Sequence, residues 1–462
     1  MVRREWISGC GLHWKKKWPG MRKAWKRLAA VGMALCITGV TMISEVGSVS
    51  AAPVDSSFDM SASSPGEEDW TKLRLDLGGP ESSDGGPWGT PIGNGVFGAK
   101  QNGGVAKDVF PLNHSTFWSG DPAYGDQLYE GGNGSYGNTP EERRAAYDEL
   151  RQMLVDAYQE GISDEDRLAI FKKVEAQTKK IWDAQCAAQS TFLPLGRMIL
   201  DFPDLTAGDT EDYSRILDMD GATSEISFKK DGVTYNRQAF ISNPDNVMAV
   251  KLGNDGTRKM NMNVSLELPS EMVGKSEMNK ITVDTEKNEI VMTGRAPYDK
   301  VGNYATWAED RGTTFEARVK VLPVNGTTTA SGNTLKVTDA DEIVLLYSCE
   351  TSYKDFKTDP AKSGIDVSGN VRRDLDAAVA KGYDKLLEDH QADFRSLFRR
   401  LWIDMEGESI SYSGTNITPF EYARHFQYGR YISLCCGREN SQTNQNPVSY
   451  THLDVYKRQI SI

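Results

Sequence analysis

The stretch KMNMNVSLEL, residues 259–268, decides the fold class of this chain. Apolar side chains occupy every second position in it, namely Met260, Met262, Val264, Leu266 and Leu268. A period of two residues is typical of a β-strand with one buried and one solvated face, as antiparallel sheets have. The stretch therefore predicts an antiparallel sheet that covers a hydrophobic core.

The neighbouring segments extend this pattern. VMAVKL (247–252) and the turn residues GNDG (253–256) predict that the strand before 259 forms a hairpin with it. EISFKKDGVTYNRQAF (225–240) predicts a second hairpin, with Asp231-Gly232 at its turn. FEARVKV (315–321) and EIVLLYS (342–348) alternate in the same way. Many strands joined by short turns indicate a mainly β fold, a large antiparallel β-sandwich over residues 70–365.

Helical patterns interrupt and follow the strands. Thr139-Pro140-Glu141-Glu142 has the order of a helix start and predicts a helical insert over 139–185. Apolar residues at helical spacing from Leu375 to Leu401 predict one long amphipathic helix in a helical linker, 366–416. Thr418 and Glu421 predict a further capped helix, in a segment that starts at 417 and is apolar nearly all round. Such a helix is expected to lie inside a larger domain.

PIGNGVFGAK (91–100) contains Gly93, Gly95 and Gly98 at the spacing of a dinucleotide-binding loop. That loop needs a strand before it and a helix after it. The upstream residues are rich in Gly and Pro, and Gly103 and Gly104 fall where the helix would begin. We therefore expect a tight hairpin with positive φ angles and close backbone approach instead of a nucleotide site.

The N-terminus has the pattern of a secretory signal peptide over residues 1–51. Basic residues precede the apolar stretch LAAVGMALCITGVTMI (28–43), and small residues follow it. An uncleaved membrane anchor is the alternative, although the stretch is short for a span. Residues 52–69 read as a flexible linker. The pattern predicts a secreted or cell-surface protein that has no membrane segment once the signal is cleaved.

Composition excludes several functions. The 462-residue chain is long enough for two or more units and carries a net charge of −12. Residues 1–51 carry +7, so the remainder carries −19, which disfavours nucleic acid as a partner. The sequence has neither an HExxH nor a GxSxG motif, and its Cys and His residues lack metal-ligand spacing. We expect neither a metal nor a cofactor.

Seven segments, in order, resemble glycoside hydrolase family 95 over roughly residues 70–440. They are TPIGNGVFGAK (90–100), PLNHSTFWSGDP (111–122), FLPLGRMILDF (192–202), YSRILDMDGA (213–222), VTYNRQAFISNPDNVMAVKL (233–252), DHQADFRSLFRRLWIDM (389–405) and FEYARHFQYGRYISL (420–434). The resemblance implies a β-supersandwich, a helical linker and an (α/α)6 barrel. It also implies a secreted bacterial α-L-fucosidase that chiefly cleaves α-1,2-linked fucose from glycans with inversion, or an enzyme acting on α-L-galactosides.

The resemblance places the catalytic residues in the barrel. Inverting hydrolysis uses two carboxyl groups about 6.5–9.5 Å apart, one as acid and one as base. No position here matches the family's Glu and Asp, so this chain is expected to be inactive, with residues 417–446 as the start of a truncated barrel. Residues 447–462 resemble a translated adaptor and are expected to be an artefactual tail.

Asn94, Asn113 and Trp118, with Asp121 beside them, are the candidate substrate-binding residues. Trp would stack on a sugar ring and Asn would bind a hydroxyl at the rim of the barrel's pocket. In the alternative, Asn113 caps a turn and Trp118 packs between sheets. The family usually has two acidic residues where this chain has His114 and Ser115. Two other hypotheses remain: a stand-alone glycan-binding sandwich and a structural surface module.

Overall fold

The computed structural model describes residues 71–75, 79–81, 89–120, 140–159, 161–185, 191–256, 258–301, 304–355, 358–401, 403, 405, 407–412 and 415–439. The chain divides into two units, Met1–Ala62 and Ser63–Ile462, and every described residue belongs to the second. The predictions for 1–51, 52–69 and 447–462 lie outside the described residues. Within the described part, no helix is long and apolar enough to cross a bilayer.

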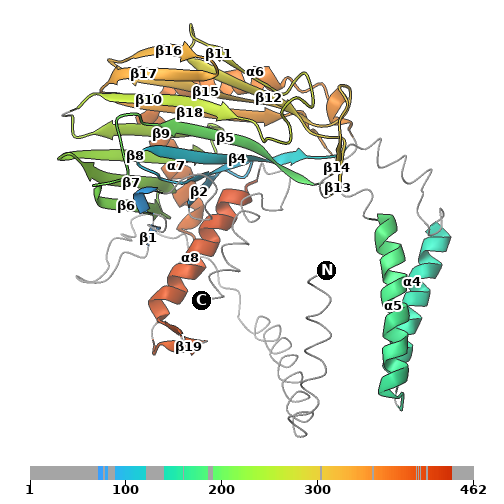
Figure 1. Ribbon diagram of the computed structural model, residues 1–462. Helices are drawn as coiled ribbons and strands as arrows, with labels where there is room; N and C mark the ends of the chain where they lie inside the picture. Colours follow the sequence, from blue (N-terminus) through green and yellow to red (C-terminus); the bar gives the residue numbers. More distant parts are fainter. Residues whose placement is uncertain are drawn as a thin grey trace. The chain divides into compact units, whose positions relative to one another are not determined.

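Two large antiparallel sheets make up most of the structure (Figure 1). The first sheet has nine strands, in the order β1 (Lys72–Arg74), β6 (Glu211–Asp218), β7 (Thr223–Lys230), β8 (Val233–Ser242), β9 (Val247–Asn254), β18 (Glu342–Thr351), β15 (Thr314–Val324), β12 (Glu289–Arg295), β11 (Lys280–Asp284). The second has seven, in the order β16 (Thr327–Ser331), β17 (Thr334–Ala340), β10 (Met260–Glu267), β5 (Phe192–Asp201), β4 (Lys107–Trp118), β3 (Phe97–Gln101), β2 (Thr90–Gly93).

Smaller elements complete the described part of the chain. Two short hairpins pair β13 (Asp299–Val301) with β14 (Tyr304–Thr306), and β19 (Ile410–Tyr412) with β20 (Thr415–Ile417). The described α-helices are α4 (Pro140–Ala157), α5 (Asp164–Gln185), α6 (Val367–Lys381), α7 (Tyr383–Phe398) and α8 (Pro419–Cys436). Short 3-10 turns occur at Gly79–Glu81 and Pro360–Lys362.

The main hydrophobic core lies between the two sheets, as the alternating strands predict. In β10 the side chains of Met260, Met262, Val264 and Leu266 are buried, whereas the residues between them are half-exposed. They join a single cluster with inward residues of both sheets, among them Phe228 and Phe315. The predicted mainly β fold, a large antiparallel sandwich with a few helices, is confirmed.

One predicted hairpin is wrong. β9 and β10 do not pair, because β9 lies between β8 and β18 in the first sheet while β10 lies between β5 and β17 in the second. The chain therefore crosses from one sheet to the other through residues 255–259. Alternation identifies the buried face of each strand, but both strands can point that face into the same core from opposite sheets. The turn residues alone do not distinguish these two connections.

Two other predicted turns are confirmed. β7 pairs with β8 across Asp231 and Gly232, whose φ angles of 52° and 77° are those of a two-residue hairpin turn. β2 pairs with β3, so the glycine-rich segment is a hairpin and not a nucleotide loop. Gly95 at its turn has a φ of 87°, which favours glycine.

The predicted single helix between Leu375 and Leu401 is two helices. Gly382 has φ 80° and ψ 157°, ends α6 and begins α7. Its backbone N–H bonds to the carbonyl oxygen of Ala378, and a residue at this φ cannot continue a right-handed helix. The apolar spacing runs through the break, so periodicity alone does not reveal it.

α6 and α7 pack against the first sheet. Val371, Leu375 and Leu386 share a buried cluster with Phe240 and Leu346 of that sheet. Ion pairs add to this contact: the Asp220 carboxylate accepts from Arg395 of α7 and from Arg399, which directly follows α7, at 2.7–2.9 Å. The linker helices are therefore fixed to the sandwich by apolar burial and by a partly buried carboxylate with two guanidinium partners.

α8 begins with the capping box that the sequence predicts, formed by Thr418 and Glu421. Its inner face is buried against α7 and the β2–β3 hairpin, and the Tyr431 hydroxyl donates to the Pro91 carbonyl at 2.7 Å. Figure 1 shows α8 beside β2. Tyr422 and Phe426, on another face, are 37% and 40% exposed. The described chain thus covers one face of this apolar helix.

The hairpin glycines allow this contact. The Gly95 N–H donates to the Cys435 carbonyl at 2.8 Å, and a Cβ at Gly93 would lie 2.7 Å from the same oxygen. A Cβ at Gly95 would lie 2.8 Å from the Arg438 side chain. Both distances are too short for a real Cβ, so the C-terminal end of α8 approaches a backbone without side chains.

α4 and α5 lie in the predicted helical insert, 139–185, and pack on each other. Ala146 and Ala157 of α4 are buried, and Gln177 of α5 donates to Glu149 at 3.1 Å. The Tyr158 ring meets Phe171 edge-on, with centroids 6.1 Å apart.

Two glycine substitutions test the docking of α8. Gly232→Ala adds a methyl group at φ 77° in open space and should cost roughly 1–2 kcal/mol of unfolding free energy. Gly95→Ala introduces the same backbone strain from a positive φ and, in addition, a collision with Arg438. We therefore expect it to lower the unfolding free energy by at least about 1 kcal/mol more than Gly232→Ala. Urea unfolding of both variants measures the difference. Equal losses would contradict the contact.

Candidate functional site

The predicted binding residues lie at one end of the sandwich, where β4 finishes. There β4 pairs with β3 through Phe97 and His114, and with β5 through Trp118 and Phe192. The end of β18 lies on the opposite sheet, and its Thr351 is within 2.6 Å of Thr116. The structure therefore brings Asn94, Asn113 and Trp118 onto neighbouring segments, whereas Asp121 is outside the described residues.

Asn94 is buried, with 1% of its surface exposed, and its side chain is fully engaged. Its Oδ1 accepts from the N–H groups of Val96 and Phe97, both at 3.0 Å. Its Nδ2 donates to the Ser242 carbonyl and to Asn246 at 3.1 and 3.2 Å. This geometry ties the β2–β3 turn to the β8–β9 turn and leaves the Asn94 amide engaged within the fold.

Asn113 and Trp118 are placed differently. Asn113 lies opposite Gly98 at an irregularity between β4 and β5, is 9% exposed, and its Oδ1 has no hydrogen-bond partner among the described residues. Trp118 is half-buried, donates from Nε1 to the Ser115 carbonyl at 2.8 Å, and meets Phe192 edge-on. Sugar binding by the three residues stays a prediction, and Trp118 offers the most accessible surface for it.

Two further residues at this end were not singled out as binding candidates. His114 is 2% exposed, and burial lowers its pKa to about 3. Glu350, whose side chain is 27% exposed, has its Oε1 3.9 Å from His114 Nε2. Burial, and then the nearby Asp374, raise the pKa of Glu350. A histidine where the family that the sequence resembles usually has an acidic residue is the sequence signal that pointed here.

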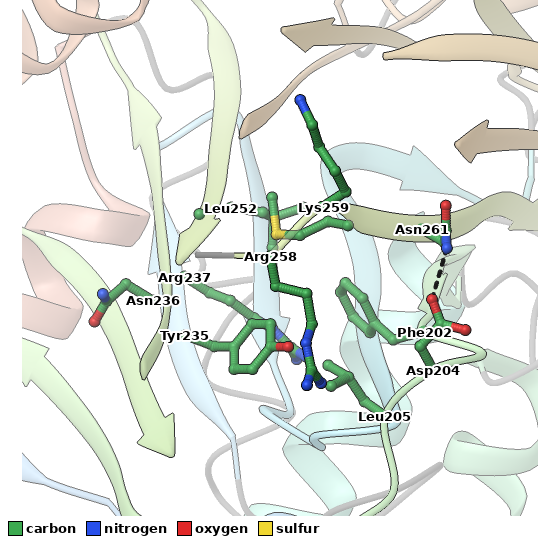
Figure 2. Close-up of a pocket in the computed structure, with 12 residues that line it drawn as sticks. Phe202, Asp204, Leu205, Tyr235, Asn236, Arg237, Leu252, Arg258, Lys259 and Asn261 are labelled. Atoms are coloured by element: carbon green, nitrogen blue, oxygen red, sulfur yellow. Dashed lines mark hydrogen bonds between the residues drawn. The ribbon is translucent and has the colours of Figure 1, made fainter. Parts of the chain in front are cut away.

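A small pocket lies beyond the other end of β5 and is lined by residues of β8, β9 and β10 and of the segments next to them (Figure 2). Phe202, Tyr235 and Arg258 are among its lining residues, and Asn261 donates to Asp204 at 2.7 Å. Its cavity volume is about 30 Å³. That is room for a few water molecules, against the several hundred Å³ of typical ligand sites. It is therefore too small to enclose a sugar substrate.

Arg237 at the base of this pocket has a structural role. Its guanidinium is 3% exposed, donates to the carbonyls of Gly104 and Val105 at 2.6 and 2.7 Å, and lies 3.9 Å from the Phe202 ring. Its Nη1 is 3.5 Å from the fully buried Asp108. These contacts hold the β3–β4 connection against β8 and leave no free guanidinium face for a ligand.

Metal binding finds no support in the described part of the chain, where no three His, Cys, Asp or Glu side chains cluster as ligands would. Three described cysteines, Cys349, Cys435 and Cys436, are buried thiols. Burial raises the pKa of Cys435 to about 12, so its thiol is not a nucleophile at neutral pH.

Comparisons with known proteins agree on one class of protein, the glycoside hydrolases. Residues 88–356 match a family model described as the N-terminal domain of glycosyl hydrolase family 65. The chain is 27% identical over 400 residues to alpha-L-fucosidase 2 of Arabidopsis thaliana, covering 80% of this chain and 43% of that protein. It is 24% identical over 371 residues to probable alpha-fucosidase A of Aspergillus niger. This match covers 76% of this chain and 41% of that protein. The chain thus spans less than half the length of these relatives.

Among solved structures, a putative kojibiose phosphorylase from human microbiome is similar, with a TM-score of 0.35 and 11% identity. The similarity covers 66% of this chain and 35% of that chain.

The buried imidazole at this site makes stability depend on pH. The folded pKa of His114, about 3, lies below the value near 6.5 of an unfolded histidine, so protonation favours the unfolded chain. The contribution of neutral His114 is complete above about pH 6.5 and is lost as the pH falls toward 3. We expect His114→Gln to flatten the fall in unfolding free energy between pH 6.5 and 4 by up to about 1.4 kcal/mol per pH unit.

Urea unfolding at several pH values measures this slope. His390, on the buried face of α7, has a pKa lowered to about 4 chiefly by burial, and it contributes the same pH dependence to wild type and variant. The matched control is His425→Gln, the same substitution at an exposed position on α8, against which the slope of His114→Gln is compared. Equal slopes for wild type and His114→Gln would rule out a buried neutral His114.

Proposed function

Because the chain belongs to the family of glycosyl hydrolase family 65 N-terminal domains, we propose that it is the N-terminal sandwich and linker of a secreted α-L-fucosidase. The proposal places that enzyme in glycoside hydrolase family 95 and gives it α-1,2-fucosylated glycans as substrates. The two named fucosidases that match about four-fifths of this chain carry the proposal.

The seven segments that resemble family 95 support the same assignment. Five of them lie in the sandwich, and the other two fall on α7 and α8. The similarity to the two fucosidases extends over 400 and 371 residues, more than the 88–356 of the domain model. Both relatives are more than twice as long as their matched regions, which supports the proposal that catalysis needs residues outside this chain.

In this proposal the sandwich helps to position the sugar substrate and does not take part in catalysis. The β4 end carries the half-exposed Trp118, and α8 is fixed nearby through Gly93 and Gly95. A catalytic domain that follows α8 would therefore meet the sandwich at this end, with Trp118 available to stack on a sugar. Large pockets lined by aromatic side chains and a few polar groups are typical of such joint sites.

Hydrolysis of 2′-fucosyllactose tests the proposal. We expect no fucose release by this chain alone. The product of the natural gene that encodes this segment should release fucose, first as the β anomer, because inversion of an α-fucoside gives β-fucose. Proton NMR during the first minutes distinguishes the anomers.

Three results would count against the proposal. Turnover by the isolated chain would contradict a catalytic centre outside it. First release of the α anomer would contradict inversion, and absence of fucose release by the whole gene product would contradict the substrate. Saturable fucose binding by the isolated chain together with an inactive whole product would favour a glycan-binding module.

A further inference from the structure

His114 ends a chain of hydrogen bonds whose direction is fixed. The backbone N–H of Thr116 points at His114 Nδ1 at 3.3 Å, and an N–H can only donate. Nδ1 is therefore an acceptor, and the proton of the neutral imidazole is on Nε2. The Thr116 hydroxyl, 2.9 Å from the same Nδ1, must then donate to it as well.

The same direction of hydrogen-bond donation continues into the opposite sheet. Since the Thr116 hydroxyl uses its proton on His114, it accepts from the Thr351 hydroxyl at 2.6 Å. Thr351 Oγ1 in turn accepts from the Tyr353 N–H at 3.3 Å. Every proton in this series points toward the imidazole, and the series leaves His114 Nε2–H as an outgoing donor.

No described residue supplies an acceptor for that donor. His114 Nε2 is fully buried and has no hydrogen-bond partner among the described residues. The facing group is Glu350 Oε1 at 3.9 Å, beyond hydrogen-bond range. Glu350 Oε1 already accepts from the Thr351 N–H at 2.8 Å, which fixes that oxygen in place. A donor and an acceptor therefore lie 3.9 Å apart without a direct hydrogen bond between them.

We infer that His114 Nε2 and Glu350 Oε1 form a binding site for one hydroxyl group. The guest must accept from an N–H and donate to a carboxylate oxygen through the same atom, which water and alcohols do. An ammonium group has no lone pair for the imidazole, and a carboxylate or phosphate would repel Glu350. An oxygen 2.8 Å from both atoms stands about 2 Å off the line between them.

Two sources can supply this hydroxyl, solvent water and a sugar. The Glu350 side chain is 27% exposed whereas His114 Nε2 is buried, so only the Glu350 side of the site faces solvent. The hydroxyl site itself follows from the hydrogen-bond directions alone. Its use by a sugar rests on the proposed function, where a fucosyl hydroxyl would displace the water.

NMR of the full chain labelled with 15N at histidine tests the site without a variant. We expect His114 in the Nε2–H tautomer, with a cross-peak from Nε2–H to a bound water. A direct His114–Glu350 hydrogen bond without a water cross-peak, or the Nδ1–H tautomer, would overturn the hydroxyl site.

L-fucose then distinguishes the two sources. If a sugar hydroxyl binds, the Nε2–H resonance shifts saturably, and Glu350→Leu weakens this binding by about tenfold or more. The matched control Glu267→Leu changes a half-exposed glutamate on β10 and should leave fucose binding unchanged. A water cross-peak without a fucose-dependent shift supports the water site and overturns the sugar. Neither result depends on hydrolysis, so failure here differs from failure of the proposed function.

Discussion

The position of the helices on the sandwich depends on the absence of side chains at Gly93 and Gly95. The carbonyl of Cys435 comes so near this hairpin that a Cβ at either glycine would collide with α8 or with Arg438. Tyr431, bonded to the Pro91 carbonyl, fixes the same helix from its buried face. These glycines have the spacing of a nucleotide-binding loop, but here they allow a helix to pack on the hairpin. This packing fixes the position of the α8 C-terminus relative to the end of β4 that carries Trp118.

Alternation in the strands predicted which faces are buried but not which strands pair. β10 buries the residues that its period of two indicates. β9 and β10 nevertheless lie in different sheets, because turn residues are the same for a hairpin and for a crossing between sheets. The break at Gly382 was equally hidden, since the apolar spacing of α6 continues into α7. Local sequence patterns indicate which face of a strand or helix is buried, whereas long-range packing determines which elements lie next to each other.

The candidate site could be predicted only in part. Sequence pointed to Asn94, Asn113 and Trp118, and the fold places them at one end of the sandwich. It could not show that Asn94 is engaged by Ser242 and Asn246, because those partners come from a distant turn. The pairing of His114 with Glu350 was hidden for the same reason: β4 and β18 belong to different sheets and meet only in the folded core.

α8 docks on the glycine hairpin of the sandwich through one face. Hydrogen exchange of the backbone amides along α8 in the full chain measures this docking most directly. We expect strong protection from Tyr431 to Cys436, comparable with that of β2, because this end of the helix packs on the hairpin. Rapid exchange of these amides, with β2 still protected, would contradict it.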